Sequence, residues 1–166
     1  HLFEQDDGFT LANTACALWA FGNCGFGLGD LHDNPFRGTV AAAIAYVMDR
    51  VHGLTLPAGG DDFDHNRNGA GVVFGEDQRF QGYVHPMTVA GLLAAGLPGL
   101  AVTVEGRSTV LAEVVEDACD TMASTLLTWG KGGWPYQYDV NSGFAQSIAG
   151  WHYLAMDASR KWGITV

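Results

Sequence analysis

The clearest structural signal in the sequence is the stretch Lys131–Gly163, KGGWPYQYDVNSGFAQSIAGWHYLAMDASRKWG. It opens with a turn of glycines and large rings, in which glycine permits positive φ and Pro135 fixes one torsion. The apolar residues that follow recur every three or four positions: Phe144, Ile148, Trp151, Ala155, Ala158 and Trp162. That spacing places them on one face of a helix, so the stretch predicts a turn that leads into an amphipathic helix.

Ahead of this stretch the sequence predicts further helices. The first covers Phe9–Gly22 and is apolar nearly all round, and a later one begins at His85-Pro86 and is uncharged through Gly96. Two amphipathic segments alternate with them. One opens at Asn34-Pro35 and carries the stripe Val40, Ile44, Val47 and Val51. The other carries the stripe Leu111, Val115, Ala118, Met122, Leu126 and Trp129, with acids on its other faces: Glu113, Glu116, Asp117 and Asp120.

Part of this pattern repeats. Thr14–Gly22 aligns without gaps on Thr88–Gly96, and Ser147–Trp151 is a third copy. An uncharged helix followed by an amphipathic one, recurring after tens of residues, is typical of helical-hairpin repeats whose first helix lies inside and second outside. Chance similarity between small apolar helices is the alternative explanation.

The turn and its helix resemble the prenyltransferase and squalene-oxidase repeat, in which a GGW-aromatic turn leads into a helix of the type S-x-x-G-W-x-x-x-A. Ser147, Gly150, Trp151 and Ala155 occupy those places. The resemblance implies a terpene cyclase-like fold. With the repeat, it predicts an all-α chain of helical-hairpin repeats, a partial α/α toroid of about five main helices. A closed toroid of the resembled family takes about five to seven hairpins, and this chain supplies about two and a half.

The chain is expected to form one α/α-repeat domain, residues 1–166. Within it we expect a first hairpin over 8–52, a long polar loop over 53–81, a second hairpin over 82–130, and the GGW turn with the final helix over 131–166. Because a repeat cannot bury its apolar face alone, the ends of an open arc need caps or a neighbour. We therefore expect a protein partner or self-association, with the chain as a subunit of a larger complex.

Composition narrows the class of partner. The net charge of −10 argues against nucleic acid and against an anionic membrane surface. With 48% hydrophobic and 16% charged residues, the chain is less polar than a soluble monomer of this size needs, which again indicates a partner. The uncharged runs Gly8–Gly29 and Val84–Val104 are long enough for a bilayer. Both are broken by glycines and polar groups, so membrane insertion is not expected.

The residues that carry chemistry in the resembled family are changed in this chain. Cyclases of the family take their acid from D-x-D-D, whereas Asp61-Asp62-Phe63-Asp64 has the order D-D-x-D. The zinc site of protein prenyltransferases needs a D-x-C, which the sequence lacks, and Ala145 replaces the Asp that opens the family's helix segment. We therefore predict no catalytic residues, and a non-catalytic helical-repeat module for protein binding or assembly.

The polar loop carries a candidate calcium site. Asp64-x-Asn66-x-Asn68-Gly69 follows the opening of an EF-hand-type loop, with oxygen ligands at alternate positions and a glycine at the turn. Asp62 could contribute from upstream and Glu76 from one place beyond the loop's twelfth position, which is Gly75. An ordinary polar connector is the alternative, because Asp and Asn form side-chain turns. A structural Ca²⁺ would favour an extracytoplasmic environment, periplasmic or at the cell surface.

The alternative function is an isoprenoid- or terpenoid-processing enzyme, or a lipid-binding protein, that uses the toroid cavity. The residues that would line the cavity are Trp134, Tyr136, His85, His152 and Trp151. Aromatic and histidine side chains at such positions are also typical of a packed core. An open pocket would favour the enzyme or the lipid carrier, and a solid core would favour binding or assembly.

Overall fold

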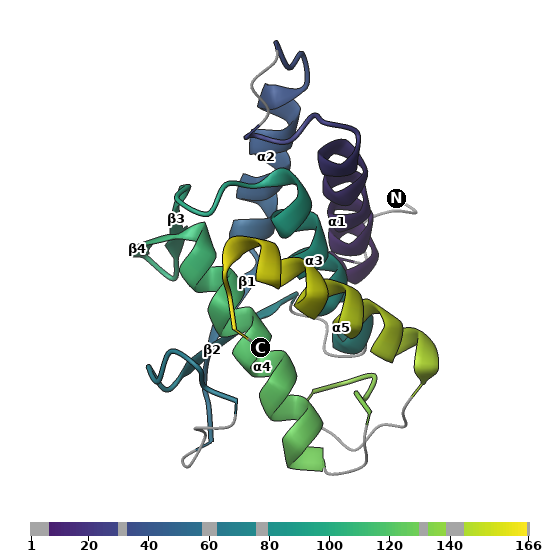
Figure 1. Cartoon of the computed structure of the whole chain (residues 1–166), viewed down its shortest axis with the longest axis vertical. Coiled ribbons are helices and arrows are strands. Elements are labelled where there is room, and N and C mark those ends of the chain that lie inside the picture. The colour runs from purple at the N-terminus through teal and green to yellow at the C-terminus, as the bar shows by residue number, and fades with distance from the viewer. Residues whose placement is uncertain are drawn as a thin grey trace.

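The computed structural model describes residues 7–29, 33–57, 63–75, 80–129, 133–138 and 145–165 (Figure 1). Its helices are α1 (Asp7–Asn23), α2 (Arg37–Met48), α3 (Gln81–Ala95), α4 (Leu111–Trp129) and α5 (Gln146–Ser159), followed by a short 3₁₀ helix, η2 (Arg160–Trp162). The strands are β1 (Val51–Thr55), β2 (Ala70–Phe74), β3 (Ala101–Val104) and β4 (Arg107–Val110).

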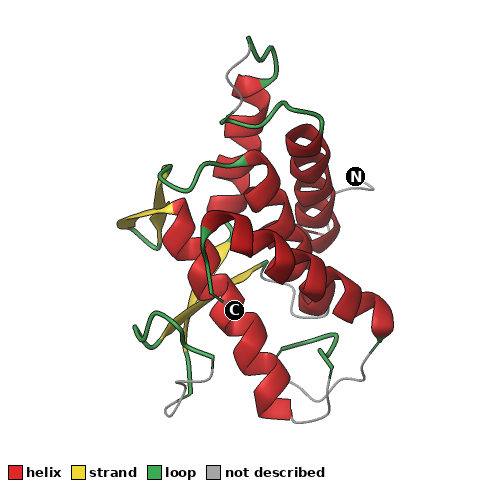
Figure 2. Ribbon diagram, viewed as in Figure 1, coloured by secondary structure: helices red, strands yellow, loops and turns green. Residues whose placement is uncertain are grey.

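The strands make the fold mixed α/β, so the all-α prediction is wrong. Of the residues that the structure describes, 57% are helical and 14% lie in strands. β1 pairs antiparallel with β2, with Val51 opposite Phe74, and β3 pairs antiparallel with β4, with Ala101 opposite Val110. Both strand pairs lie on the same side of the helices, beside α4 (Figure 2). A partial toroid made of helical hairpins alone is therefore not the observed architecture.

The strands lie where β-branched residues gather. The polar loop expected over 53–81 contains β2 and most of β1, and the hairpin expected over 82–130 contains β3 and β4. In β3 and β4 the sequences are AVTV and RSTV, and β-branched side chains favour an extended backbone. Glu105 and Gly106 connect them, both with positive φ, as a two-residue hairpin turn requires. Val51, expected to complete a helical stripe, instead begins β1.

The predicted helices are present, with some of their ends shifted. α4 begins at Leu111 and ends at Trp129, the first and last residues of its predicted stripe. α3 begins at Gln81 rather than at His85, so Pro86 lies inside the helix. There its missing N–H removes one helical hydrogen bond.

α3 is the central helix of the fold. It packs between α1 and α5 (Figure 1), and α4 and β2 also contact it. Most of its side chains are buried. The repeat copies at Thr14–Gly22, Thr88–Gly96 and Ser147–Trp151 coincide with α1, α3 and α5. The repeated sequence therefore marks three helices of which the middle one contacts the other two.

Glycines allow α1 and α3 to approach closely. A Cβ at Gly91 would lie 2.5 Å from the carbonyl oxygen of Ala15, and a Cβ at Gly22 would lie 2.2 Å from the carbonyl oxygen of Ala94. Carbon and oxygen atoms that are not bonded to each other do not approach this closely, so a Cβ at either position would force the backbone to move. The packing of these two helices therefore depends on glycine at both positions.

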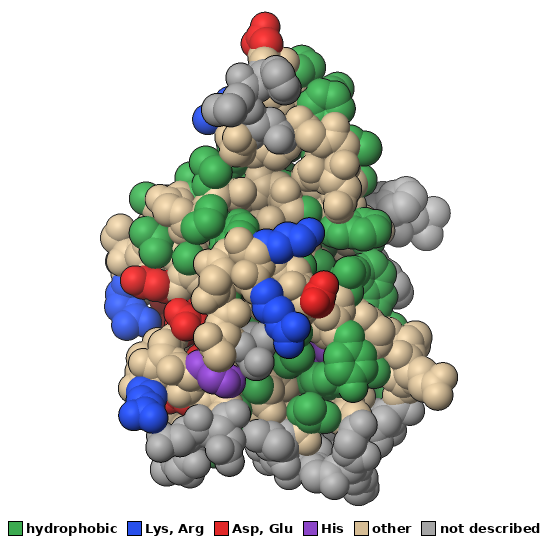
Figure 3. Space-filling view, viewed as in Figure 1, with side chains coloured by type: hydrophobic (Ala, Val, Ile, Leu, Met, Phe, Trp, Pro, Cys, Tyr) green, Lys and Arg blue, Asp and Glu red, His purple; other side chains and the backbone are tan. Residues whose placement is uncertain are grey.

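Apolar side chains also reach the surface. On the face seen in Figure 3, hydrophobic side chains are interspersed with few charged ones. Among the described residues, the large apolar side chains that are exposed are Trp19, Phe36, Leu54, Leu97, Tyr153 and Leu154. Among the described helices, none combines the length and the apolar character needed to cross a bilayer.

Candidate functional site

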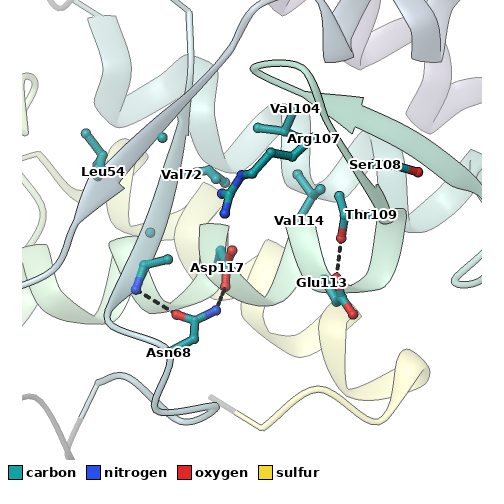
Figure 4. Close-up of a pocket in the computed structure, with 13 residues that line it drawn as sticks. Leu54, Asn68, Val72, Val104, Arg107, Ser108, Thr109, Glu113, Val114 and Asp117 are labelled. Carbon is teal, nitrogen blue, oxygen red and sulfur yellow. Dashed lines mark hydrogen bonds between the residues drawn. The ribbon is translucent and has the colours of Figure 1, made fainter.

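The two strand pairs and α4 enclose a cleft of about 320 Å³ (Figure 4). Its apolar lining comes from three of the strands and from the helix: Leu54 of β1, Val72 of β2, Val104 of β3 and Val114 of α4. The Glu105 side chain joins the two strand pairs, because its Oε1 accepts a 3.0 Å hydrogen bond from the N–H of Gly53. This bond holds the β3–β4 turn against β1.

Two acids project into the cleft from one face of α4. Glu113 and Asp117 are four residues apart, so they lie about one turn apart along the same face of the helix (Figure 4). The Thr109 hydroxyl donates to Oε2 of Glu113. Arg107 extends from β4 over the cleft, and its side chain is exposed. Within the described part of the chain, no ion pair joins Arg107 to either acid.

Asp117 is held by the loop that precedes β2. Its Oδ1 accepts hydrogen bonds from Nδ2 of Asn66 at 3.0 Å and Nδ2 of Asn68 at 2.9 Å. Burial raises the pKa of the Asp117 carboxyl above its usual range, and the two amide donors oppose that rise. The negative charges of Glu113 and Asp64 raise the pKa further. Asp117 is therefore a partly desolvated acid in the middle of other acids.

The loop itself is ordered by Asp64. Its carboxylate accepts from the N–H of Asn68 at 3.2 Å and from the N–H of Gly69 at 2.9 Å. Gly69 has φ +69°, a conformation that suits glycine. The structure thus brings three of the predicted calcium ligands, Asp64, Asn66 and Asn68, beside α4. The other two, Asp62 and Glu76, lie outside the described residues. The described residues contain no group of three or more His, Cys, Asp or Glu side chains already arranged to hold a metal ion.

Asp120, one turn beyond Asp117, is completely buried, contrary to its expected place on a polar outer face. Its Oδ1 lies 3.3 Å from the backbone N and 3.4 Å from the ring Nδ1 of His65, whereas Oδ2 has no hydrogen-bond partner. Burial raises the pKa of Asp120 to about 6, with a smaller rise from Asp64 and an opposing effect of His65. A carboxyl in this state is costly to ionise.

Three of the five predicted cavity residues meet, but they form packed core instead of an open pocket. The Trp134 ring stacks on His152 with centroids 4.4 Å apart, and its Nε1 donates to the carbonyl of Met122. His85 lies 5.4 Å from the Tyr138 ring, which also contacts His152. All three predicted residues are at most 1% exposed.

The other two predicted cavity residues lie elsewhere. Tyr136 contacts Tyr83 with ring centroids 5.7 Å apart, and Trp151 makes an edge contact with Trp19 at 6.4 Å. Both are half-buried. They do not join the histidine cluster.

Both histidines of the cluster are neutral and have fixed tautomers. In His85, Nδ1 accepts from the N–H of Phe74 at 3.2 Å, so Nε2 carries the proton that it donates to the carbonyl of Ala118 at 3.1 Å. Burial lowers the pKa of His85 to about 4 and that of His152 to about 3, and in each ring a hydrogen bond to a backbone carbonyl opposes the shift. Neither ring is set up for proton transfer at neutral pH.

Sequence reasoning missed most of the cleft. Glu113 and Asp117 were expected on a solvated helix face, and Arg107 and Thr109 lie in a strand that was not predicted. The signals were present in the sequence: acids four residues apart, and the run VTVEGRSTV, in which β-branched residues flank a Glu-Gly turn.

A scan against models of known protein families found no match, and searches of curated proteins and of solved structures found none either. The resemblance to the prenyltransferase and squalene-oxidase repeat therefore rests on its sequence motifs alone.

Proposed function

We propose that this chain is a non-catalytic protein-binding module whose cleft holds a short extended segment of a partner protein. The observation that supports this proposal is the arrangement of the cleft, in which apolar walls surround a pair of acids on α4. Ligand clefts commonly measure roughly 300–1,000 Å³ and combine apolar walls with a few convergent polar groups. The volume of about 320 Å³ fits one or two side chains of a bound segment.

The apolar walls of the cleft favour a bound segment in which every second side chain contacts them. Leu54 is 40% exposed although it lies in a strand, and Val72 and Val104 face the same space. In an extended segment, successive side chains point in opposite directions. Every second side chain of the segment can therefore contact these walls while the others meet the polar groups.

The acids select a basic side chain. Glu113 and Asp117 lie on one helix face, and the chain as a whole has a net charge of −10, which steers cations toward it. A lysine or arginine of the segment would pair with the exposed carboxylate of Glu113 and the half-buried carboxylate of Asp117. Arg107, exposed above them, offers donors to a backbone carbonyl of the same segment.

The described geometry favours this function over the isoprenoid alternative. Trp134, His85 and His152 fill space in the core, and their polar atoms bond to protein groups. The cleft, by contrast, is open, and among its described side chains no ion pair neutralises Glu113, Asp117 or Arg107.

The test uses two acetylated and amidated heptapeptides, one alternating valine with lysine and the other valine with glutamate. We expect the lysine peptide to shift the amide resonances of β1, β4 and the first turns of α4 in a heteronuclear NMR titration. Glu113→Gln should weaken this binding about tenfold, because one of the paired charges is lost. Glu116→Gln, on the same helix outside the cleft, is the matched control. Equal shifts with both peptides, or shifts confined to other elements, would overturn the proposal.

A further inference from the structure

The loop before β2 has the backbone arrangement of a cation-binding turn. In EF-hand-type loops, side chains at the first, third and fifth positions ligate calcium, and a glycine at the sixth makes the sharp turn. Counting from Asp64, these positions are Asp64, Asn66, Asn68 and Gly69. In the structure, Gly69 has φ +69° and Asp64 accepts hydrogen bonds from the N–H groups of the fifth and sixth positions.

The loop lacks its own closing acid, and α4 supplies one. The twelfth position, where a bidentate glutamate usually completes the ligand set, is Gly75. Asp117 instead receives both Asn side chains on a single oxygen, at 3.0 and 2.9 Å. The side chains of Asn66 at the third position and Asn68 at the fifth position thus meet at one oxygen of the Asp117 carboxylate. The carboxamide oxygens accept from the backbone, Asn66 Oδ1 from the N–H of Asn68 at 3.0 Å and Asn68 Oδ1 from the N–H of Ala70 at 2.6 Å. Each of these oxygens keeps a second lone pair that can face a cation.

A second, independent observation points to a ligand. Asp120 is 0% exposed and its carboxyl faces the loop, because Oδ1 contacts the backbone N–H and the ring of His65. Its Oδ2 is buried without a hydrogen-bond partner. Buried carboxylate oxygens in folded proteins are bonded or bind metal, so this orphaned oxygen, on a carboxyl that contacts the loop at His65, is compensated best by a cation.

We propose that loop 64–70 and the middle of α4 form a calcium site, with Asp64, Asn66 and Asn68 as loop ligands and Asp117 and Asp120 as the helical acids that close it. The donor atoms are carboxylate and carboxamide oxygens, which suit a hard cation. Calcium accepts six to eight such oxygens in irregular geometry, whereas magnesium demands a near-ideal octahedron and retains water. The site differs from the loop-only site predicted from sequence, because two of its acids come from a helix far along the chain.

Calcium chloride titrated calorimetrically into protein freed of metal with a chelator tests the proposal. We expect one calcium per chain and a rise of the melting temperature with calcium. Asp64→Asn and Asp120→Asn should each weaken calcium binding about tenfold or more. Asp157→Asn, an exposed acid on α5, is the matched control and should leave the affinity unchanged.

The melting temperature measured in chelator shows whether Asp120 acts as a calcium ligand or only as a structural acid. Asp120→Asn removes a buried charge and keeps an oxygen for His65, so without calcium this variant should melt no lower than wild type. The absence of calcium binding would overturn the proposal, as would an equal affinity in Asp120→Asn and Asp157→Asn. A response to magnesium chloride as strong as that to calcium would overturn the assignment of the ion.

Discussion

The Tyr138 hydroxyl donates a 2.6 Å hydrogen bond to Nε2 of His152, and this bond ties the segment 133–138 to α5. Nδ1 of the same ring lies 3.0 Å from the carbonyl oxygen of Ile148, so Nδ1 carries the proton and Nε2 is free to accept. The two buried histidines therefore have opposite tautomers, each set by a backbone carbonyl.

Removing the Tyr138 hydroxyl should destabilise the protein. In Tyr138→Phe the buried Nε2 of His152 loses its donor, which costs about 1–3 kcal/mol of unfolding free energy. Urea unfolding followed by circular dichroism measures the change. Tyr153→Phe removes a hydroxyl from a side chain that is 62% exposed and should change stability by less than about 0.5 kcal/mol. Equal effects of the two substitutions would contradict the assigned hydrogen bond.

Stability should fall as the pH is lowered from about 6.5 toward 4. The folded pKa values of His85 and His152, about 4 and 3, lie below the ordinary value of 6.5, so in this window the unfolded chain binds more protons than the folded one. Stability is then fully present above pH 6.5 and is lost on acidification, by up to about 1.4 kcal/mol per pH unit for each histidine.

Asp120 should oppose this loss of stability in acid. Its folded pKa is raised to about 6, so between its ordinary value of 3.8 and pH 6 the folded chain binds the extra proton. Asp120→Asn removes that contribution and should steepen the loss on acidification. Urea midpoints at several pH values between 4.5 and 7.5 measure both slopes. A slope that is unchanged in the variant would show that Asp120 titrates normally in the folded state.

Replacing glycine by alanine should have opposite effects on stability at two helical positions. Gly91→Ala places a methyl 2.5 Å from a backbone oxygen of α1 and should destabilise the protein by about 1–3 kcal/mol, because neither helix can move without losing contacts. Gly150→Ala adds its methyl in open space on α5 and should stabilise by about 0.5–1 kcal/mol through helix propensity. Thermal unfolding of both variants tests the close packing of α1 on α3.

The cysteines should react at different rates. Cys24 is exposed, whereas Cys119 is buried and its burial raises the thiol pKa to about 12. A disulfide reagent that reports released thiolate should modify Cys24 within the folded protein and Cys119 only after denaturation. Rapid reaction of Cys119 in Cys24→Ser, under native conditions, would indicate that α4 opens more readily than its packing implies.

The helices could be predicted from the sequence, because their apolar residues recur at helical spacing. α4 is the clearest case, since Leu111 and Trp129 mark both its predicted and its observed ends. The repeat also marked α1, α3 and α5, which pack together. The strands were missed, because four- and five-residue stretches carry little periodicity. β2 and most of β1 fell in the expected polar loop, and β3 and β4 fell in the expected second hairpin.

The cleft and the neighbouring calcium loop could be predicted only in part. The alternating Asp64, Asn66 and Asn68 were identified, since their spacing is local. Their partner Asp117 was not, because a contact across about fifty residues depends on how the β1–β2 pair docks on α4. The burial of Asp120 was missed for the same reason, since a helical pattern shows which residues share a face but not what covers that face.

The packing of α1 on α3 has a consequence for synthesis on the ribosome. Residues 24–80 separate the two helices, so α1 emerges long before the helix that covers its apolar face. From Gly8 to Asn23 α1 carries no charged residue, so until then it offers a surface containing glycine and alanine to any other nascent chain. Slow, non-local closure of this kind exposes a chain to aggregation. The longer the delay between translation of residue 23 and translation of residue 95, the more the chain should depend on chaperones. Slowing translation across the β1–β2 region should therefore lower the yield of soluble protein.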